Sequence, residues 1–501
     1  MRILVNGIVD ERLHRPLSLI ADLFFEEATL ITNDDEASAD IVIALTQEIM
    51  NQTIYTKAVL EDSSQDKMYE STFERKITNT EDEKALFKQK KHSFLYVFLK
   101  VLEQHTGMIQ KWGLLTGVRP TKLWHQYVKK NIDSSVAKME LHDTYSISDE
   151  KLDLLEEIVA RQLQVIPDLY DLKREVSLYI GIPFCPTKCA YCTFPAYAIN
   201  GRQGNVTSFL GGLHYEMREI GKWLKDNNIK ITTIYFGGGT PTSISAEEMD
   251  MLYEELYESF PDVSKVREIT VEAGRPDTIT PEKLQVLKKW NIDRISINPQ
   301  TYTQETLKAI GRHHTVEETI EKYKMAKEAG MKNVNMDLII GLPGEGVPEL
   351  QNSLHETEKL MPESLTVHTL SFKRASEMTR NKMRYKVADR TEVEQMMNEA
   401  EKWTSSHGYH PYYLYRQKNI LGNLENVGYA LPGMESLYNI LIMEEQQTIV
   451  GLGCGAASKF IDPDNGKITH FANPKDPKSY NDGYEYYTNK KIEYLHELLK
   501  R

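Results

Sequence analysis

Three of the four cysteines in this chain of 501 residues fall within one short loop. Cys185, Cys189 and Cys192 are spaced C-x3-C-x2-C in the segment IPFCPTKCAYC, which follows the apolar stretch EVSLYIGI. Clustered cysteines, in a chain with too few for a disulfide framework, indicate metal or redox chemistry. Thiolates hold iron–sulfur clusters, and three of them leave one iron of a [4Fe–4S] cluster without a protein ligand. The loop therefore predicts a cluster that binds a further molecule at its open iron, as catalytic metal sites do.

Two other interpretations of the loop stay open at this point: a structural zinc site and three reduced thiols in the core. A structural zinc ion needs a fourth ligand nearby. The segment after the loop, TFPAYAINGRQG, contains no cysteine or histidine, and His214 is the next candidate. The position of the loop after a predicted strand, with Tyr191 before the third cysteine, favours the cluster.

Composition excludes several classes of function. The formal net charge of −13 argues against a protein that mainly binds nucleic acid, because phosphate binding needs a basic face, although a local basic pocket is compatible with it. No stretch approaches the roughly 20 apolar residues of a membrane span. The first apolar run is interrupted by Asp10 and Glu11, so it lacks the long apolar core of a secretory signal. We expect a globular cytoplasmic protein with no membrane span.

Short apolar strands alternate with helical segments from about residue 175. The strands are EVSLYIGI, ITTIYF, EITVEA, DRISIN, VNMDLII and LTVHTL. Ser245 precedes Glu248 in a capping-box pattern, Thr315 precedes Glu318 in the same way, and Pro281 fits a first helical position. Successive strand–helix units predict an α/β fold with a parallel sheet and helices outside it. We predict a partial, open (β/α)6 barrel, and a doubly wound sheet fits the same pattern.

The chain divides into three predicted regions. Residues 1–170 have the pattern of an additional N-terminal α/β domain, with strands in RILVNGIV and DIVIALTQ. Residues 171–375 hold the strand–helix core, and residues 376–501 form a C-terminal α+β domain expected to cover a substrate. In this last region TEVEQMMNEAEKWTSSHGYHPYYLY predicts a helix followed by an aromatic strand. The polar, aromatic segment KDPKSYNDGYEYYTNKK is expected on the surface.

Further motifs follow the cysteine loop in chain order: GGGTP after ITTIYF, then TVEAGRPDTIT, RISINPQTY, IGRHHT, NMDLIIGLPGE and GLGCGAAS. Together with the loop they resemble the radical S-adenosylmethionine (SAM) superfamily and, within it, the oxygen-independent coproporphyrinogen III oxidase family, in particular its HemZ-type branch. The resemblance implies a [4Fe–4S] cluster whose open iron binds SAM and whose electron cleaves it to a 5′-deoxyadenosyl radical. The protein's part is to position this cofactor and to exclude competing reactions.

The resemblance also implies a role for individual residues. Tyr179, Gly238 and Glu272 are implied to contact the SAM on the cluster, which Cys185, Cys189 and Cys192 hold. A second site of SAM size is implied to be lined by Tyr191, Gly239, Thr240, Gln300, Arg312 and Asp337, with smaller contributions from Ser371 and Ala457. Nearly all of these follow the carboxyl ends of predicted strands, where parallel α/β folds have their active sites. Taken singly, a residue such as Glu272 is as well explained by helix capping, and it is the joint order of the motifs that favours the site.

The function implied by the resemblance is oxidative decarboxylation in anaerobic haem biosynthesis. Propionate side chains of coproporphyrinogen III become vinyl groups, giving protoporphyrinogen IX, and an electron-donor protein serves the cluster. A substrate with four carboxylates needs local cations, for which Arg275, Lys373, Arg374 and Arg416 are candidates. Two other functions remain: a haem-binding or trafficking protein of the same fold, and a radical SAM tetrapyrrole methyltransferase linked to haem breakdown.

The chain departs from the family pattern at three places. Gly181 stands where relatives often carry a histidine, and Phe194 where some carry a further cysteine. The segment ENVGYALPGMESLYNI lacks the HN-x-x-YW signature of the haem-chaperone branch, which disfavours the trafficking function. Cys454, in GLGCGAAS, is expected to be a small packed residue rather than a fourth cluster ligand.

Overall fold

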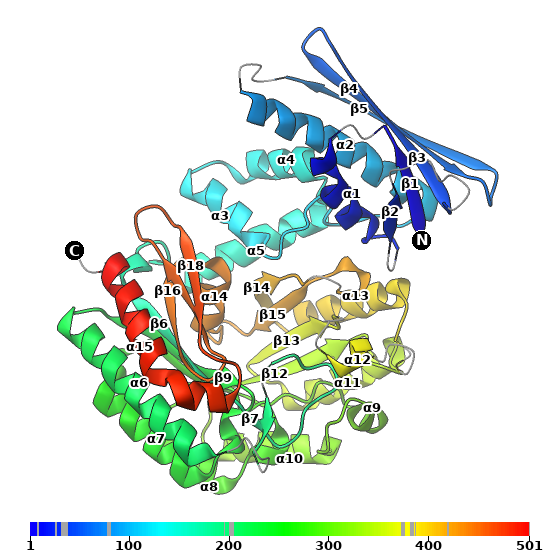
Figure 1. Ribbon diagram of the computed structural model, residues 1–501. Coiled ribbons are helices and arrows are strands. Elements are labelled where there is room, and N and C mark those ends of the chain that lie inside the picture. Colours follow the sequence, from blue (N-terminus) through cyan, green and yellow to red (C-terminus); the bar gives the residue numbers. More distant parts are fainter. Residues whose placement is uncertain are drawn as a thin grey trace. The chain divides into compact units, whose positions relative to one another are not determined.

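The computed structural model describes residues 1–7, 10–25, 28–31, 39–77, 82–194, 196–199, 205–371, 376–380, 385, 387–417 and 420–499. The chain separates into two compact units, Met1–Glu156 and Glu157–Arg501. Each is described by itself below, and Figure 1 labels their elements. The division into three domains that the sequence suggested stays a prediction.

The first unit is built on a five-stranded sheet in the order β2-β1-β3-β4-β5. The first three strands pair in parallel, and β3, β4 and β5 continue antiparallel. Helices α1 and α2 pack on the sheet through a core that includes Ile3, Leu17 and Phe98, all fully buried. The elements are β1 (Arg2–Asn6), α1 (His14–Ala21), β2 (Thr29–Ile31), β3 (Ile41–Met50), β4 (Thr53–Asp62), β5 (Lys67–Lys76), α2 (Glu83–Thr106), α3 (Thr121–Lys129), α4 (Ser134–Tyr145) and α5 (Asp149–Val165), which crosses the boundary at residue 156.

The second unit contains an 11-stranded sheet in the order β14-β15-β13-β12-β11-β10-β9-β6-β16-β17-β18. Its centre is a run of parallel strands, β6, β9, β10, β11, β12 and β13, which correspond to the strands predicted from the sequence. Their bounds are β6 (Val176–Ile182), β9 (Ile231–Gly238), β10 (Glu268–Val271), β11 (Arg294–Ser296), β12 (Asn333–Ile340) and β13 (Ser364–Thr369). Spatial order follows chain order without reversal, which distinguishes this singly wound arrangement from a doubly wound sheet.

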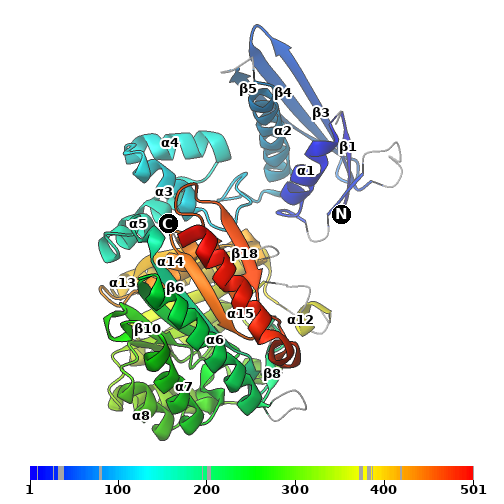
Figure 2. The ribbon, with the colours of Figure 1, turned by 60° about the vertical axis from the view of Figure 1, so that its left-hand side comes forward.

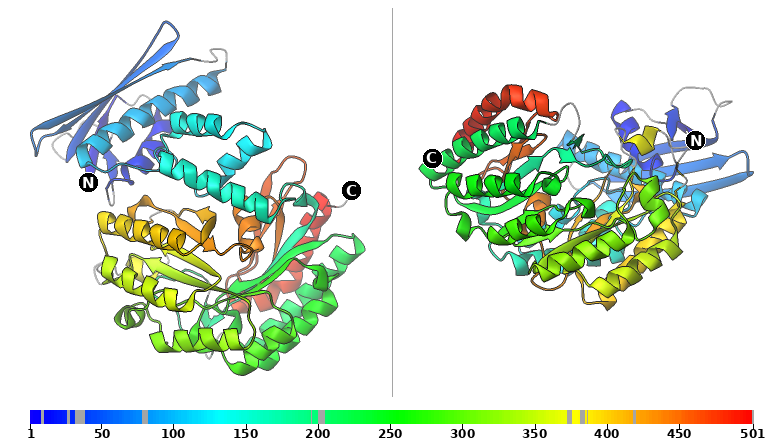
Figure 3. Two further views of the ribbon diagram at one scale, coloured as in Figure 1. Left: turned by 180° about the vertical axis from the view of Figure 1, so that it is seen from behind. Right: turned by 90° about the horizontal axis from the view of Figure 1, so that it is seen from below.

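Helices connect the parallel strands and lie along the outer side of the sheet, as Figure 3 shows from behind. The sequence signals at their starts are confirmed. Ser245 and Glu248 form a reciprocal capping box, the Thr315 side chain accepts from the amide of Glu318, and Pro281 opens its helix. The helices are α6 (Val206–Asp226), α7 (Ala246–Ser259), α8 (Pro281–Lys289), α9 (Gln304–Ala309), α10 (Val316–Glu328) and α11 (Val347–Leu360).

Segments beyond residue 375 extend the same sheet at both edges. β15 joins β13 antiparallel at one edge, and β16 joins β6 in parallel at the other. The predicted helix and aromatic strand are confirmed as α13 and β14. The remaining elements are β7 (Phe184–Cys185), β8 (Tyr197–Ala198), α12 (Glu377–Arg380), α13 (Arg390–Ser406), β14 (His410–Tyr415), β15 (Asn426–Ala430), α14 (Leu437–Glu444), β16 (Thr448–Gly453), β17 (Ala457–Ile461), β18 (Ile468–Ala472) and α15 (Pro477–Leu499).

The expectation of polar surface structure at residues 475–491 is wrong in one respect. The segment begins helix α15, which lies alongside α6 in Figure 2, and Tyr480 and Lys491 are fully buried in that contact. The sequence pattern misled because a tyrosine hydroxyl and a lysine ammonium are typical of surfaces, yet both are buried when partners satisfy them. Within the described ranges, no helix is both long enough and apolar enough to cross a membrane.

Candidate functional site

The three clustered cysteines lie in the loop that follows β6. Cys185 and Cys189 are buried, Cys192 is half-buried, and all three are free thiols. Cys185 Sγ lies 3.3 Å from Thr240 Oγ1. Thr240 belongs to the GGGTP segment, which lies at the end of the neighbouring strand β9. The backbone amide of Cys192 donates to the Cys189 carbonyl at 3.1 Å, which tightens the turn between these two residues. Strand pairing therefore brings the cysteine loop and the GGGTP segment together, as the carboxyl ends of neighbouring parallel strands require.

Two buried arginines flank Cys189. The Arg275 guanidinium donates to both Asp277 carboxylate oxygens at 2.9 and 2.6 Å and to Thr187 Oγ1 at 3.0 Å. Its Nη1 also lies 3.8 Å from Cys189 Sγ. Arg312 Nη1 donates to the Asn298 carbonyl at 2.8 Å and to the Gly274 carbonyl at 3.2 Å. Burial lowers the pKa of Arg312, but nearby groups that include Cys189 raise that pKa overall. The two guanidinium groups therefore place positive charge beside this sulfur.

The glycines of GGGTP are needed where the chain passes close to the cysteine strand. Gly238 has φ +108°, and a Cβ there would lie 2.9 Å from the Ile182 carbonyl oxygen. A Cβ on Gly239 would lie 2.5 Å from the Phe184 carbonyl oxygen. The amides of Gly239 and Thr240 donate to these two carbonyls, each at 2.7 Å. Close backbone approach thus accounts for the glycines, independently of any ligand.

A stack of tyrosines surrounds Glu272 at the end of β10. Tyr235 donates a short hydrogen bond to Glu272 Oε1, and its ring stacks on Tyr438 with centroids 4.4 Å apart and on Tyr179 at 6.1 Å. Burial raises the pKa of Glu272 to about 7. Of these residues the sequence pointed to Tyr179 and Glu272. Tyr235 lies inside a predicted strand, and Tyr438 lies in ENVGYALPGMESLYNI, a segment noted only for the signature that it lacks, so neither carried a motif signal.

A cavity of about 200 Å³ lies beside the cysteine loop and gathers residues from several strand ends. Asp337 accepts from Asn335 Nδ2 at 2.7 Å and lies 3.4 Å from His368 Nε2. Burial would raise the pKa of Asp337, but these partners lower it overall, which favours the carboxylate. The lining residues that the sequence predicted are Tyr191, Gln300, Asp337 and Ser371, together with Cys192, and those it missed include His368, Tyr415 and Asn426.

Other predicted residues lie apart from this cavity. Ala457 is exposed at the start of β17, and its backbone lies against Gly451 of β16. Cys454 is buried, its thiol donates to the Pro474 carbonyl at 3.3 Å, and burial raises its pKa to about 12. A Cβ on Gly181 would lie 2.9 Å from the Cys454 carbonyl oxygen, so a histidine at this position would displace the backbone. The departure at Gly181 therefore has a packing reason in this chain.

The candidate cations for substrate carboxylates are mostly committed elsewhere. Arg275 is held as described above, and Arg416 is buried with its guanidinium 2.5 Å from Asn423 Oδ1. Burial lowers the pKa of Arg416 to about 10. Lys373 and Arg374 lie outside the described residues.

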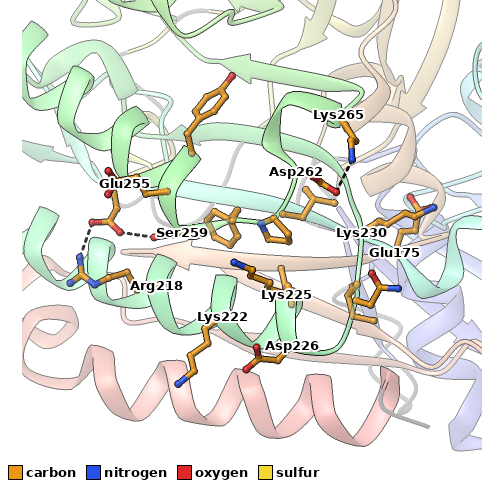
Figure 4. A pocket seen from close by; sticks show the side chains of 18 of the residues that line it. Glu175, Arg218, Lys222, Lys225, Asp226, Lys230, Glu255, Ser259, Asp262 and Lys265 are labelled. Atoms are coloured by element: carbon orange, nitrogen blue, oxygen red, sulfur yellow. Dashed lines mark hydrogen bonds and ion pairs between the residues drawn. The ribbon is translucent and has the colours of Figure 1, made fainter.

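A larger cavity, of about 1280 Å³, lies at the opposite ends of the strands. Its lining residues Glu175, Lys230 and Arg267 directly precede β6, β9 and β10 in the chain. Figure 4 shows Glu175 and Lys230 among the residues that line it. Much of its charge is paired internally, as between Arg218 and Glu255 at 2.7 Å. None of the predicted site residues lines it, and parallel sheets have their active sites at the carboxyl ends of strands.

The residues at the cysteine end fit a metal cluster with a polar ligand. Three free thiols supply its protein donors. The buried polar atoms without partners in the described chain include Gln300 Oε1, Asn298 Oδ1 and Arg312 Nε, and such groups are costly unless something hydrogen-bonds to them. No three His, Cys, Asp or Glu side chains in that part of the chain are grouped to hold a single ion. A cluster does not require this, because each thiolate binds a different iron.

Comparison with known proteins gives three results. A family model described as the radical SAM superfamily matches residues 179–356. The oxygen-independent coproporphyrinogen-III oxidase-like protein HemZ of Bacillus subtilis (strain 168) is 64% identical over 501 residues, which is 100% of this chain and 99% of that protein. The heme chaperone HemW of the same organism is 32% identical over 282 residues, or 56% of this chain and 70% of that protein.

Solved structures add a likeness in fold. The coproporphyrinogen III oxidase HemN from Escherichia coli, described as a radical SAM enzyme, aligns with a TM-score of 0.52 and 20% identity. The alignment covers 65% of this chain and 72% of that chain. The second unit thus has a mixed α/β fold of the radical SAM type.

Proposed function

This chain belongs to the radical SAM superfamily and, within it, to the HemZ-like group of oxygen-independent coproporphyrinogen III oxidase-like proteins, and from this we propose that it is itself a coproporphyrinogen III oxidase. The observation that carries the proposal is the meeting, in one cavity, of Cys192 with Tyr191, Gln300 and Asp337. These four residues come from three separate motifs, the cysteine loop, RISINPQTY and NMDLIIGLPGE, whose order suggested the family. Superfamily membership implies a [4Fe–4S] cluster and SAM as cofactors.

The proposed site has three parts. Cys185, Cys189 and Cys192 would hold the cluster, and Tyr179, Gly238 and Glu272 would contact the SAM on it. The cluster and SAM, when bound, supply the hydrogen-abstracting radical. A second SAM-sized ligand would contact the cavity residues Tyr191, Gln300, Asp337 and Ser371. The resemblance adds Gly239, Thr240, Arg312 and Ala457, which lie outside the lining of that cavity.

The chain's own groups would orient these ligands. Gln300 Oε1 is buried without a partner and is available to accept from a ligand amine or hydroxyl. Gln300 has φ 67°, a left-handed backbone that is uncommon outside glycine, so this orientation is maintained against local strain. Asp337 is kept ionised by His368 and Asn335 and offers a second acceptor in the same cavity. Arg275 and Arg312 place positive charge beside Cys189 and stabilise electron density on that sulfur.

The reaction class follows from the family. One hydrogen atom leaves the β-carbon of a propionate, the bond to its carboxylate breaks, carbon dioxide departs, and a vinyl group forms. The remaining electron passes to an acceptor, and an electron-donor protein reduces the cluster for the next turnover. Two propionates react in this way to give protoporphyrinogen IX.

An anaerobic product assay tests the proposal. The chain, purified without oxygen and with its cluster reconstituted, is incubated with reductant, SAM and coproporphyrinogen III, and the porphyrins are separated after oxidation. Protoporphyrin and a monovinyl intermediate are expected, and the Cys189→Ala variant should yield neither. Cleavage of SAM without any vinyl product would refute the substrate assignment while leaving the radical SAM chemistry intact. A methylated linear tetrapyrrole would favour the methyltransferase alternative.

A haem-binding function is the second candidate, because the heme chaperone HemW of Bacillus subtilis matches 56% of this chain. Titration of the purified chain with haem, followed by the Soret band, separates the two. A saturable shift of that band with no vinyl product in the assay above would favour haem binding.

A further inference from the structure

The first unit carries an apolar groove for which neither the motifs nor the proposed chemistry gives a use. Its volume is about 530 Å³, within the range of roughly 300–1,000 Å³ typical of small-molecule sites. Its walls come from α1, α2, the segment after α2 and the end of α4. The apolar lining is formed by Pro16, Leu19, Ile20, Leu95 and Leu114.

Cations surround this apolar surface. Arg15, Lys88 and Lys91 line the groove, and none of the three makes a hydrogen bond or an ion pair with any described residue. No aspartate or glutamate is among the described lining residues, although the whole chain has a net charge of −13. On α2, Lys88, Lys91 and Leu95 share one face at helical spacing, so charge and apolar surface are presented together.

The histidine that lines the groove, His92, already has a hydrogen-bond partner at each ring nitrogen. His92 Nε2 lies 2.6 Å from the Thr144 carbonyl oxygen, and its Nδ1 lies 3.0 Å from Arg75 Nη1. Because arginine can only donate, Nδ1 must accept and Nε2 must donate, which makes this histidine neutral. Burial lowers the pKa of His92, in agreement with that state. Among the described lining residues, the positive charge of the groove therefore comes from Arg15, Lys88 and Lys91.

From the apolar lining and the unpaired cations we propose that this groove binds an amphipathic anion, a compound with an apolar body and one or more carboxylates. The apolar body would cover Leu19, Leu95 and Leu114, and Arg15, Lys88 and Lys91 would pair with the carboxylates. Two sources share this chemistry: a tetrapyrrole with propionate side chains and a long-chain fatty acid. The proposal rests on the first unit alone and does not require the proposed activity of the second.

The test is direct binding of defined probes to the full chain. Coproporphyrin III represents the tetrapyrrole source and oleate the fatty-acid source, measured by fluorescence and by calorimetry. A tetracationic pyridinium porphyrin serves as a probe of similar shape and opposite charge. We expect at least one carboxylate probe to bind and the cationic porphyrin not to bind. Failure of both carboxylate probes, or equal binding of the cationic porphyrin, would overturn the proposal.

Matched variants locate the binding. The double substitution Lys88→Glu with Lys91→Glu should lower the affinity for the carboxylate probe at least about tenfold, because it replaces two charge-assisted contacts by repulsion. Lys67→Glu with Lys76→Glu makes the same change in net charge on β5, where both lysines are exposed outside the groove, and should leave affinity unchanged. Unchanged affinity in the groove variant overturns the proposal, since any binding would then lie elsewhere, including at the cysteine end. A wild-type dimer that Leu95→Asp converts to a monomer would assign the groove to a second copy and would also overturn it.

Discussion

Lys491 and Glu216 form an ion pair in which neither side chain is exposed to solvent. Lys491 Nζ also donates to the Gly451 carbonyl at 2.8 Å, and Glu216 Oε2 accepts from the Gly453 amide at 2.7 Å and from Tyr480 Oη at 2.8 Å. The pair thereby joins α15 and α6 to the end of β16. Because β16 lies in parallel beside β6, the strand that precedes the cysteine loop, this contact supports the candidate site from behind.

Breaking this pair should be costly. Glu216→Gln leaves the buried ammonium of Lys491 without its counter-charge, and we expect a loss of about 3–5 kcal/mol in the free energy of unfolding. Urea denaturation of the full chain measures it. Lys490→Met, on the same helix but at an exposed pair with Glu493, should leave the free energy of unfolding nearly unchanged, because exposed ion pairs contribute little to stability. Equal stability of the two variants would contradict the role assigned to the buried pair.

The cysteine loop should behave differently from Cys454. Cys189→Ala removes one of three thiolates, so the reconstituted chain should lack both the visible absorbance of the cluster and all SAM cleavage. Cys454→Ala should retain the full iron and sulfide content, because this thiol is directed to the Pro474 carbonyl. Iron analysis and absorbance spectra decide both outcomes. Retained SAM cleavage in Cys189→Ala would exclude the proposed cluster.

Arg275 should raise the reduction potential of the cluster. A guanidinium beside Cys189 stabilises the more negative, reduced cluster, so Arg275→Leu should lower its reduction potential, by an amount on the order of 50 mV. Potentiometric titration followed by electron paramagnetic resonance measures the shift, and Arg275→Lys should restore part of it. Arg267→Leu removes an arginine that is paired with Asp168 on the surface and provides the control. An unchanged potential in Arg275→Leu would show that this cation does not influence the cluster.

Glu272 should make stability depend on pH. Burial raises the pKa of Glu272 to about 7 from an ordinary value of 4.5. Between pH 4.5 and about 7, Glu272 is therefore protonated in the folded chain and ionised in the unfolded chain. The stability contributed by this proton is fully present below about pH 4.5 and is lost as pH rises through about 7. Thermal denaturation of the cluster-free chain between these limits should show this decline, and Glu272→Gln should remove that part of it. A decline of the same size in the variant would assign it to other groups.

The glycine-rich segment should tolerate no side chain at Gly239. In Gly239→Ala the new Cβ meets the Phe184 carbonyl oxygen, and displacement of either backbone should cost about 1–3 kcal/mol and reduce cluster reconstitution. Gly211→Ala is the matched control, because nothing lies within 4 Å of its Cβ and the residue is inside helix α6. That control should gain about 0.5–1 kcal/mol from better helix propensity. Denaturation midpoints and iron content distinguish the two, and a stable, fully loaded Gly239→Ala would contradict the close approach described here.

Much of the second unit could be predicted from local patterns. Apolar runs with intervening caps predicted β6, β9, β10, β11, β12 and β13, since burial on both faces of a parallel sheet makes each strand apolar along its length. The cysteine spacing and the GGGTP segment marked two neighbouring strand ends that the structure brings together. Of the eight residues predicted to share the second site, Tyr191, Gln300, Asp337 and Ser371 line one cavity. Gly239, Thr240, Arg312 and Ala457 are not among its lining residues, and the binding of SAM stays a proposal.

The sequence by itself therefore determined the order of strands, the strand ends at which the motif residues gather, and the superfamily, because each of these depends on spacing within a short segment. Only the tertiary structure decided the partners. Lys491 meets Glu216 across 275 residues, and Tyr438 stacks on Tyr235 although no motif links them. Arg275, a candidate for substrate carboxylates, proved to be committed to Asp277 and Cys189. Whether a charged or aromatic side chain is exposed or buried depends on which distant segment packs over it, and periodicity within one segment carries no information on that.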